Sequence, residues 1–355
     1  MAAPAASTSV TRPKVDLYSD TVTRPTAGMR KAIAEAEVGN EQAHEDPTVN
    51  RLQDMVAELL GKEAAVFLPS GTMCNEIAYR VWCDRGDEII LDETGHALHF
   101  EAGGPAALAG AMTRTVRGVR GIFTGADVDA AIRPKNRHAP RQKLISIENT
   151  ANLGGGAVWP LETVKGVAAA ARRHGLKLHM DGARLLNGVV ASGISADTFA
   201  ADCDSVWIDL SKGLGCPVGG VLAGSAEFIE EAWRFKHQFG GAMRQAGIVA
   251  AAGVYALEHH VERMADDHAR ARRFAEGIAG VKGVQVSANE IDTNMVYFQV
   301  GDTGIEAPAF SKRLMAKHGV RISAIDGRLR AVTHLDVDDG DIETAIAAVR
   351  AVAAG

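Results

Sequence analysis

Short apolar, β-rich runs alternate with helical patterns through the middle of this 355-residue chain, and this alternation limits its possible folds. Strands separated by helices predict βαβ units and a mostly parallel sheet. Ligands of such sheets gather at the carboxyl ends of the strands. A Gly/Ala-rich helix is also expected from about His96. The expected strands are AAVFL (64–68), EIIL (88–91), LISIE (144–148), LKLHM (176–180), SVWIDL (205–210) and VGGVLAG (218–224).

The C-terminal part has a different pattern. Apolar positions keep helical spacing from about Val254 to Ile278, which predicts one long helix or two in series. A chain of this length is too long for one compact core. The prediction is an α/β protein with a large domain and a smaller C-terminal α+β domain. Its expected divisions are a leader (1–14), an N-terminal segment (15–55), the large domain (56–253), and a linking helix with the small domain (254–355).

Composition excludes several classes of partner. The net charge of −6 argues against nucleic acid or an anionic membrane as the main partner. No apolar run approaches the ~18 residues needed to cross a bilayer. The stretch MAAPAASTSVTRPK (1–14) has no apolar core and is predicted to be a disordered tail rather than a secretion signal. The four cysteines lack CxxC spacing, which predicts reduced thiols and a cytoplasmic location.

Lys212 is the first candidate for chemistry, because it follows the strand at 205–210 inside the glycine-flanked turn Ser211-Lys212-Gly213-Leu214-Gly215. A lysine becomes a nucleophile when burial or a nearby cation lowers its pKa, and it then forms a Schiff base with an aldehyde such as pyridoxal phosphate (PLP). The alternative for a single lysine is ordinary solvation. A carboxylate at the end of another strand favours a Schiff-base role for Lys212 over simple solvation.

Asp181 is that carboxylate, and it ends the strand LKLHM. It can pair with a protonated pyridine nitrogen, although capping a helix is its ordinary role. Arg184 can face the same pocket and bind a substrate carboxylate, or form a surface ion pair. The turn Ser70-Gly71-Thr72 opens a helix after a strand, so its N–H groups can receive a phosphate or simply be capped.

Two histidines lie in loop-like segments. His96 (GHALHFEAGG) and His138 (RPKNRHAPRQ) can stack on a flat ring or take a proton near neutral pH, although a single histidine is more often structural. The acidic and histidine cluster around His259 is better explained as a solvated helix face. No metal site is therefore expected.

Taken in order, the motifs make the chain resemble the low-specificity L-threonine aldolases, which are PLP enzymes of the aspartate-aminotransferase-like fold (fold type I). The resemblance runs from about Asp16 to Val337. The motifs are DLYSDTVTRPT (16–26), EDPTVNRL (45–52), FLPSGTMCN (67–75), GHALHFEAGG (95–104), ISIENT (145–150), HMDGARLLN (179–187), LSKGLGCPVGGVLAG (210–224), GGAMRQAG (240–247) and AVTHLDV (331–337).

The resemblance implies a role for each matching residue. Lys212 would hold PLP, Asp181 would bind its ring nitrogen, and His96 would stack on the ring. Its phosphate would lie on Ser70, Gly71 and Thr72, with help from Arg244. The substrate carboxylate would lie on Ser19, Arg184 and Arg330, and His138 would lie near the substrate hydroxyl. Members of this fold build the active site across a dimer interface, which implies a homodimer or homotetramer with shared active sites.

The implied reaction is retro-aldol cleavage of a β-hydroxy-α-amino acid, such as L-threonine, L-allo-threonine or phenylserine, to glycine and an aldehyde. A PLP β-eliminating lyase with the same fold and lysine is the alternative, and a catalytically silent PLP-binding protein is a third interpretation. The chain departs from the family at Ala43 and His44, where a tyrosine is common nearby, and at Ala151, where a histidine is common. These positions bear on the preferred substrate side chain.

Overall fold

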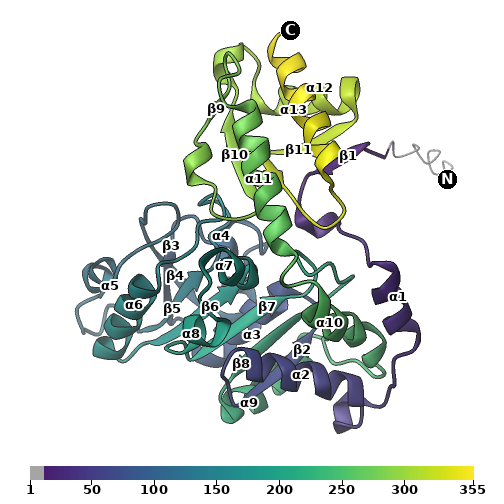
Figure 1. The fold of residues 1–355 in the computed structure, drawn as a ribbon. Helices are drawn as coiled ribbons and strands as arrows, with labels where there is room; N and C mark the ends of the chain where they lie inside the picture. The colour runs from purple at the N-terminus through teal and green to yellow at the C-terminus, as the bar shows by residue number, and fades with distance from the viewer. Residues whose placement is uncertain (1–11) are drawn as a thin grey trace, which may run out of the picture.

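Two β-sheets divide the chain into a larger and a smaller part in this computed structural model, which describes residues 12–355 (Figure 1). The leader expected at 1–14 lies outside these residues, apart from its end at Arg12 to Lys14. The other expected domain boundaries stay predictions.

The larger part is built on a seven-stranded sheet of order β2-β8-β7-β6-β5-β3-β4. Strands β7, β6, β5, β3 and β4 are parallel, whereas β8 runs antiparallel to both of its neighbours. The mostly parallel sheet is as the sequence predicts. Its strands are β2 (Ala64–Leu68), β3 (Glu88–Asp92), β4 (Met112–Val116), β5 (Gln142–Glu148), β6 (Lys177–Gly182), β7 (Ser205–Asp209) and β8 (Gly220–Gly224).

Helices cover both faces of this sheet, so its central strands are buried along most of their length. All residues of β3, β7 and β8 are buried. The helices that belong to this part and to the N-terminal segment are α1 (Ala27–Ala34), α2 (Pro47–Leu59), α3 (Gly71–Trp82), α4 (His96–His99), α5 (Gly125–Ala131), α6 (Leu161–His174), α7 (Leu185–Ser192), α8 (Ala196–Ala200), α9 (Ala226–Gln238) and α10 (Gly247–His259).

Local sequence signals set where several helices begin. Asp46 caps α2 through the N–H of Val49, and Pro47 follows it at the first helical position, where a missing N–H costs nothing. Ser70 caps α3 in the same way through Met73. These caps fix the entry of the chain into the helices on either side of β2.

The helix expected from His96 is much shorter than predicted. Only the four residues of α4 are helical, and a π-helical turn over Pro105–Ala109 follows before β4. The Gly103-Gly104-Pro105 stretch explains the break, because Gly103 has a φ of +76° and Pro105 cannot donate an N–H. Strand β4, which was not expected, takes the place of the helix.

The smaller part contains a five-stranded sheet of order β1-β11-β12-β10-β9. The expected long helix after 254 is two helices in series, α10 and α11. Strand β1 pairs in parallel with β11, so the N-terminal segment enters the C-terminal sheet. The elements are β1 (Val15–Leu17), α11 (Met264–Ile278), β9 (Gln285–Val286), β10 (Met295–Gln299), α12 (Ala307–His318), β11 (Val320–Ile325), β12 (Arg328–Val332) and α13 (Asp339–Ala353).

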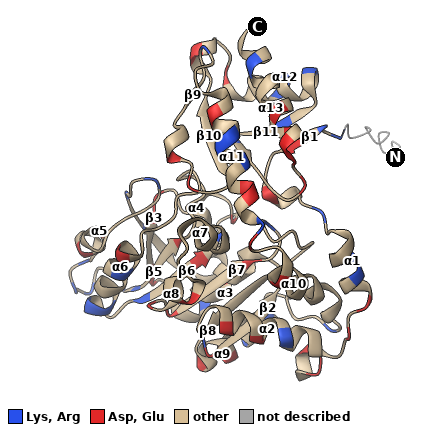
Figure 2. Cartoon of the chain, viewed as in Figure 1, with Lys and Arg blue, Asp and Glu red and all other residues tan. Residues whose placement is uncertain are grey.

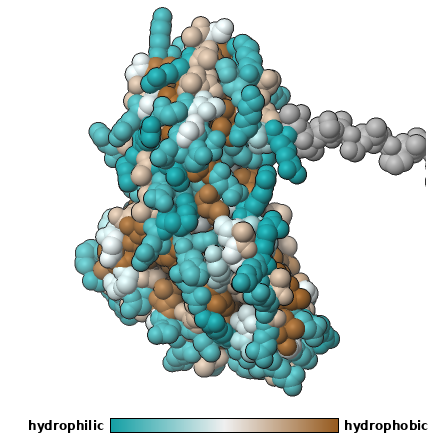
Figure 3. Space-filling view, turned by 45° about the vertical axis from the view of Figure 1, so that its right-hand side comes forward, coloured by the Kyte–Doolittle hydropathy of each residue, from teal (hydrophilic) through white to brown (hydrophobic). Residues whose placement is uncertain are grey.

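The smaller part has its own hydrophobic core, which holds residues of α11, α12 and α13. In the larger part, α2, α6, α7 and α10 pack in the main core, whereas α3 and α9 pack in a separate cluster. Acidic and basic residues are interspersed over both parts (Figure 2). The face shown in Figure 3 is largely hydrophilic, with hydrophobic side chains in separate patches. Among the residues described, no helix combines the length and apolarity that a membrane span needs.

Candidate active site

Carboxylates stand at the carboxyl ends of three neighbouring parallel strands. Glu148 ends β5, Asp181 lies at the end of β6, and Asp209 ends β7. Glu148 and Asp181 are direct partners in the β5–β6 register, so they lie side by side. Burial and the charge of Asp181 raise the pKa of Glu148 to about 7. This edge of the sheet borders a cavity of about 210 Å³.

Lys212 lies in this cavity, in the turn after β7. Its Nζ is 2.9 Å from Oδ2 of Asp209, and its side chain is only 13% exposed. Oδ1 of Asp209 accepts hydrogen bonds from both the backbone N–H and the hydroxyl of Ser211, at 2.8 Å each. Asp209 therefore holds the turn and directs the amine of Lys212 into the cavity.

Asp181 faces the same cavity and is nearly fully buried. Its Oδ1 accepts the N–H of Ala183, and its Oδ2 accepts a hydrogen bond of 2.8 Å from Nδ2 of Asn75. Asn75 comes from the first half of α3, whose N-terminus lies at the same edge. The carboxylate is thus fixed by both its own turn and a helix 106 residues earlier in the chain.

His96 also lines this cavity. Its backbone N–H binds Oε2 of Glu148 at 2.9 Å, and its ring Nδ1 lies 2.8 Å from Oε1 of Glu101. Burial lowers the pKa of His96, but the hydrogen bond to Glu101 and the charges of Asp181 and Glu148 outweigh burial and raise it. One ligand-type atom from each of His96, Glu101 and Asp181 lies within 4.8 Å of the others.

The N-terminus of α3 also borders the cavity of Lys212. Gly71 and Thr72 line the cavity, whereas the hydroxyl of Ser70 is used to cap the helix. A Cβ at Gly71 would collide with the ring of Trp207, so glycine is required for the helix to start this close to β7. The free N–H groups of the first turn and the positive end of the helix dipole favour an anion here.

The three residues expected to hold a substrate carboxylate form a second, adjoining group. The guanidinium of Arg184 binds Asp20 through two hydrogen bonds of 2.7 and 2.6 Å, and both side chains are buried. Ser19 precedes Asp20 and caps the short 3₁₀ helix Asp20–Val22, whose Thr21 lines the cavity of Lys212. Arg330 binds Asn152 and the carbonyl of Tyr18, while its buried Nε has no partner among the described residues.

Two expected residues are not brought to this site by their own chain. His138 is exposed in the loop before β5, at the end of that strand opposite to Glu148. Arg244 is also exposed, and its Nη1 binds Oε1 of Gln42 at 3.0 Å. Its loop is held by a buried ion pair of 2.9 Å between Lys236 and Glu41, and Glu41 also accepts the N–H of Met243.

Sequence reasoning missed several residues of the site. All of them lie inside or beside the family motifs of the sequence. A polar side chain within an apolar helix or strand, as at Asn75, could have marked them for attention. They are Asp20, Asn75, Glu101, Trp207 and Asp209.

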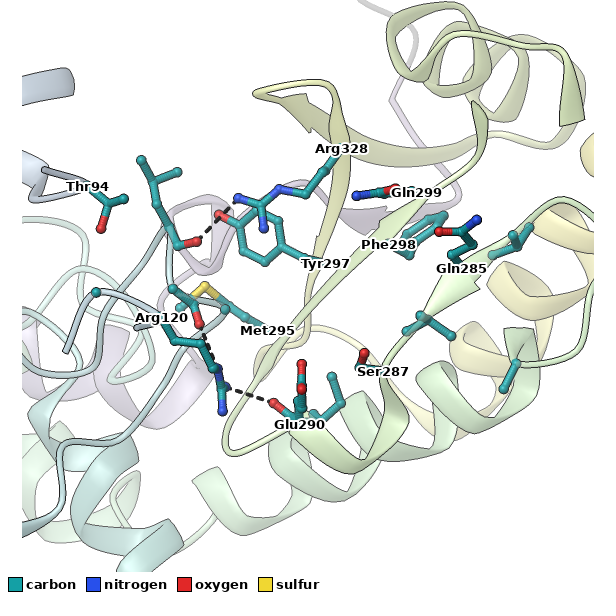
Figure 4. A pocket seen from close by; sticks show the side chains of 18 of the residues that line it. Thr94, Arg120, Gln285, Ser287, Glu290, Met295, Tyr297, Phe298, Gln299 and Arg328 are labelled. Carbon is teal, nitrogen blue, oxygen red and sulfur yellow. Dashed lines mark hydrogen bonds between the residues drawn. The ribbon is translucent and has the colours of Figure 1, made fainter. Parts of the chain in front are cut away.

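A larger cavity than that of Lys212 lies elsewhere in the described residues. A space of about 670 Å³ separates the loops after β4 and β5 from the face of β9 and β10 (Figure 4). Arg328 reaches across it to the carbonyl of Leu153, and Arg120 binds the carbonyl of Glu290. It contains no lysine amine or strand-end carboxylate, so the smaller cavity around Lys212 is the better candidate for catalysis.

The residues around Lys212 fit pyridoxal phosphate. An amine for its aldehyde, a carboxylate for its ring nitrogen, an imidazole for its ring face and a helix N-terminus for its phosphate converge on one cavity. Each of these groups lies on a different element, and each polar side chain is held by neighbours rather than free to turn away. The donor set suits this cofactor.

Two solved structures illustrate the fold that this chain shares. The threonine aldolase of Leishmania major superposes with a TM-score of 0.80 at 18% identity, covering 96% of this chain and 99% of that one. The aspartate aminotransferase of Rhizobium meliloti gives 0.70 at 13% identity, covering 96% and 92%. Fold and site together define a PLP-dependent enzyme of fold type I.

Sequence relatives narrow the class to a family. A family model described as beta-eliminating lyase matches residues 16–300. The chain is 44% identical to the low specificity L-threonine aldolase of Escherichia coli K12, covering 91% of this chain and 94% of the relative. It is 40% identical to low-specificity L-threonine aldolase 1 of Arabidopsis thaliana, covering 92% and 93%. The chain belongs to the low-specificity L-threonine aldolase family.

The buried pair of Asp20 and Arg184 should make a measurable contribution to stability. Burial alone would raise the pKa of Asp20, but the charge and hydrogen bonds of Arg184 hold it well below its usual range. Asp20→Asn leaves Arg184 buried without a counter-charge, so we expect a loss of about 3–5 kcal/mol in the free energy of unfolding near pH 7. Because the folded-state pKa is depressed, this contribution is present above pH ~4 and is lost at lower pH.

Denaturant unfolding across pH 3 to 8 measures this difference. Asp84→Asn is the matched control, because the Asp84 side chain is 75% exposed, and its effect should stay within about 0.5 kcal/mol. Equal losses for the two variants would contradict the role of the buried pair.

Proposed function

We propose that this protein cleaves β-hydroxy-α-amino acids, with L-threonine and L-allo-threonine as the first candidates, to glycine and an aldehyde. This reaction would make it a carbon–carbon lyase of the aldehyde-lyase type. The observation that carries the proposal is the single cavity in which Lys212, Asp181 and His96 converge. The names of the close relatives point to the same reaction.

Four groups of the chain would hold the cofactor. Lys212 would bind its aldehyde carbon through Nζ, and Asp181 would bind the protonated ring nitrogen. The N–H groups at the start of α3 would receive the phosphate. When bound, PLP supplies an aldehyde that combines with the substrate amine and a ring that accepts the electron pair of the breaking Cα–Cβ bond.

Other side chains would place the substrate and move its proton. The buried Nε of Arg330 has no partner among the described residues, which suits a carboxylate oxygen, and Arg184 is held by Asp20 through two hydrogen bonds. Holding the carboxylate sets which bond of Cα stands perpendicular to the cofactor ring and therefore which bond breaks. His96 would take the proton of the β-hydroxyl, because its ring lies in the cavity and its pKa is raised.

We also propose that two or more copies complete the site. Arg244 and His138 are both exposed and lie outside the cavity of their own chain. A homodimer or homotetramer would allow these side chains to reach the phosphate and the substrate hydroxyl of a neighbouring copy.

The four free cysteines are all buried, which is consistent with a reducing, cytoplasmic environment.

One assay separates the candidate functions. L-threonine, L-allo-threonine and phenylserine should each give glycine and an aldehyde, and their D forms should give neither. O-acetylserine and cysteine test the alternative, since a β-eliminating lyase converts them to pyruvate and ammonia. Pyruvate without glycine would replace the aldolase proposal, and cofactor binding without either product would favour a catalytically silent protein.

Lys212→Ala should abolish both turnover and covalent attachment of PLP after borohydride reduction, because no amine remains at the turn after β7. Peptide mass mapping of the reduced protein measures the attachment. Lys62→Ala is a suitable control, since Lys62 is half-buried far from this cavity and binds the carbonyls of Ala200 and Cys203. Attachment that persists in Lys212→Ala would remove the central assignment.

Arg330→Ala should raise KM for the amino acid by about ten- to a hundredfold, the usual effect of losing a charge-assisted hydrogen bond to a carboxylate. Binding of PLP should change little, because Arg330 lies outside the cavity of Lys212. Steady-state kinetics and cofactor titration measure the two effects. An unchanged KM would contradict the carboxylate role.

A further inference from the structure

We infer that Glu101 is a positioning residue for His96, and that the amide of Asn75 ties it to Asp181, so that the imidazole and the carboxylate at the cofactor site are set by one buried network. The inference rests on the proposed function, in which His96 takes the substrate proton. It adds Glu101 and Asn75 to the residues that act in the proposed reaction.

Glu101 contacts the ring of His96 directly. The side chain of Glu101 is fully buried, and its Oε1 is 2.8 Å from Nδ1 of His96. An ionised carboxylate only accepts, so the proton of a neutral His96 lies on Nδ1. Nε2 is then the basic nitrogen, and it has no hydrogen-bond partner among residues 12–355. Glu101 thereby selects the tautomer that can take a proton.

The neighbours of Asn75 determine which way its side-chain amide faces. Nε1 of Trp207 can only donate, and it lies 2.7 Å from Oδ1 of Asn75. His179 Nε2 adds a second contact to the same oxygen at 3.1 Å. The amide nitrogen must therefore face the two carboxylates, and it binds Glu101 and Asp181 at 2.8 Å each.

A second buried carboxyl, that of Glu76, lies close enough to Glu101 to feel its charge. Glu76 lies on α3, and both its oxygens are buried without a partner among the described residues. Burial and the charge of Glu101 raise the pKa of Glu76 to about 9, so Glu76 is neutral near pH 7. Gly104 makes room for it, since a Cβ there would collide with its carboxyl oxygen. Glu101 differs from Glu76 in its contacts, because its Oε1 accepts the N–H of Asn75 and lies against Nδ1 of His96.

The charges around His96 come from several elements. Glu101 follows on the same segment, Glu148 ends β5 and Asp181 lies at the end of β6, while Lys212 and Asp209 line the same cavity. Among these, only Glu101 contacts the ring nitrogen directly. Removing its charge should therefore change His96 more than the other groups do.

The test compares Glu101→Gln with Glu76→Gln in the full chain carrying PLP. Glu101→Gln should lower kcat for L-threonine about ten- to a hundredfold, within the range of general-base effects, and leave KM within about twofold. The acid limb of its pH profile should move to lower pH, because His96 loses the partner that raises its pKa. Glu76→Gln replaces a neutral acid with a neutral amide and should behave as wild type.

A second measurement does not depend on activity. In protein with isotope-labelled histidine, NMR titration should give a lower pKa for His96 in Glu101→Gln, with the signal assigned by His96→Asn. The wild-type ring should carry its proton on Nδ1. A proton on Nε2 in wild type, an unchanged His96 titration in Glu101→Gln, or an equal kcat loss in Glu76→Gln would overturn the inference. Absence of glycine release by wild type would instead overturn the proposed function, and the titration would still decide the pairing.

Discussion

The common direction of β5, β6 and β7 is the constraint on which the rest of the site depends. Because these strands are parallel neighbours, Glu148, Asp181 and the turn after Asp209 emerge at one edge of the sheet. The helix after β2 begins at the same edge and adds Gly71, Thr72 and Asn75. An antiparallel pair at this place would have sent one of the carboxylates to the opposite edge.

That arrangement concentrates polar groups where water is largely excluded, so each must find a partner within the protein. Asn75 uses both its donors and its acceptor in this way. Burial lowers the pKa of His179 to about 4, which keeps it neutral and spares the core an unpaired charge. Glu76 and Nε of Arg330 are exceptions, since their buried polar atoms have no partner among the described residues.

The smaller sheet contributes to the site as well as to stability. Strand β1 leads directly to Ser19 and Asp20, and β12 carries Arg330 toward the larger part. Asp20 then joins the two parts, since it binds Arg184 after β6 and Asn294 before β10. The residues proposed to bind the substrate thus lie where the two sheets meet, whereas those proposed to hold the cofactor belong mainly to the large sheet and the start of α3.

The sequence by itself determined the parallel α/β arrangement, the turn of Lys212 and the family, because these depend on local patterns and on motifs in a fixed order. It could not pair Asp20 with Arg184, or Asn75 with Asp181, since those partners lie 164 and 106 residues apart. Only the tertiary structure decided these contacts, because they follow from the strand order of the large sheet and from the entry of β1 into the small one. It likewise decided that His138 and Arg244 lie outside the cavity of their own chain. The loop before β5 is at the strand end opposite to Glu148, and the loop after α9 is held by Glu41.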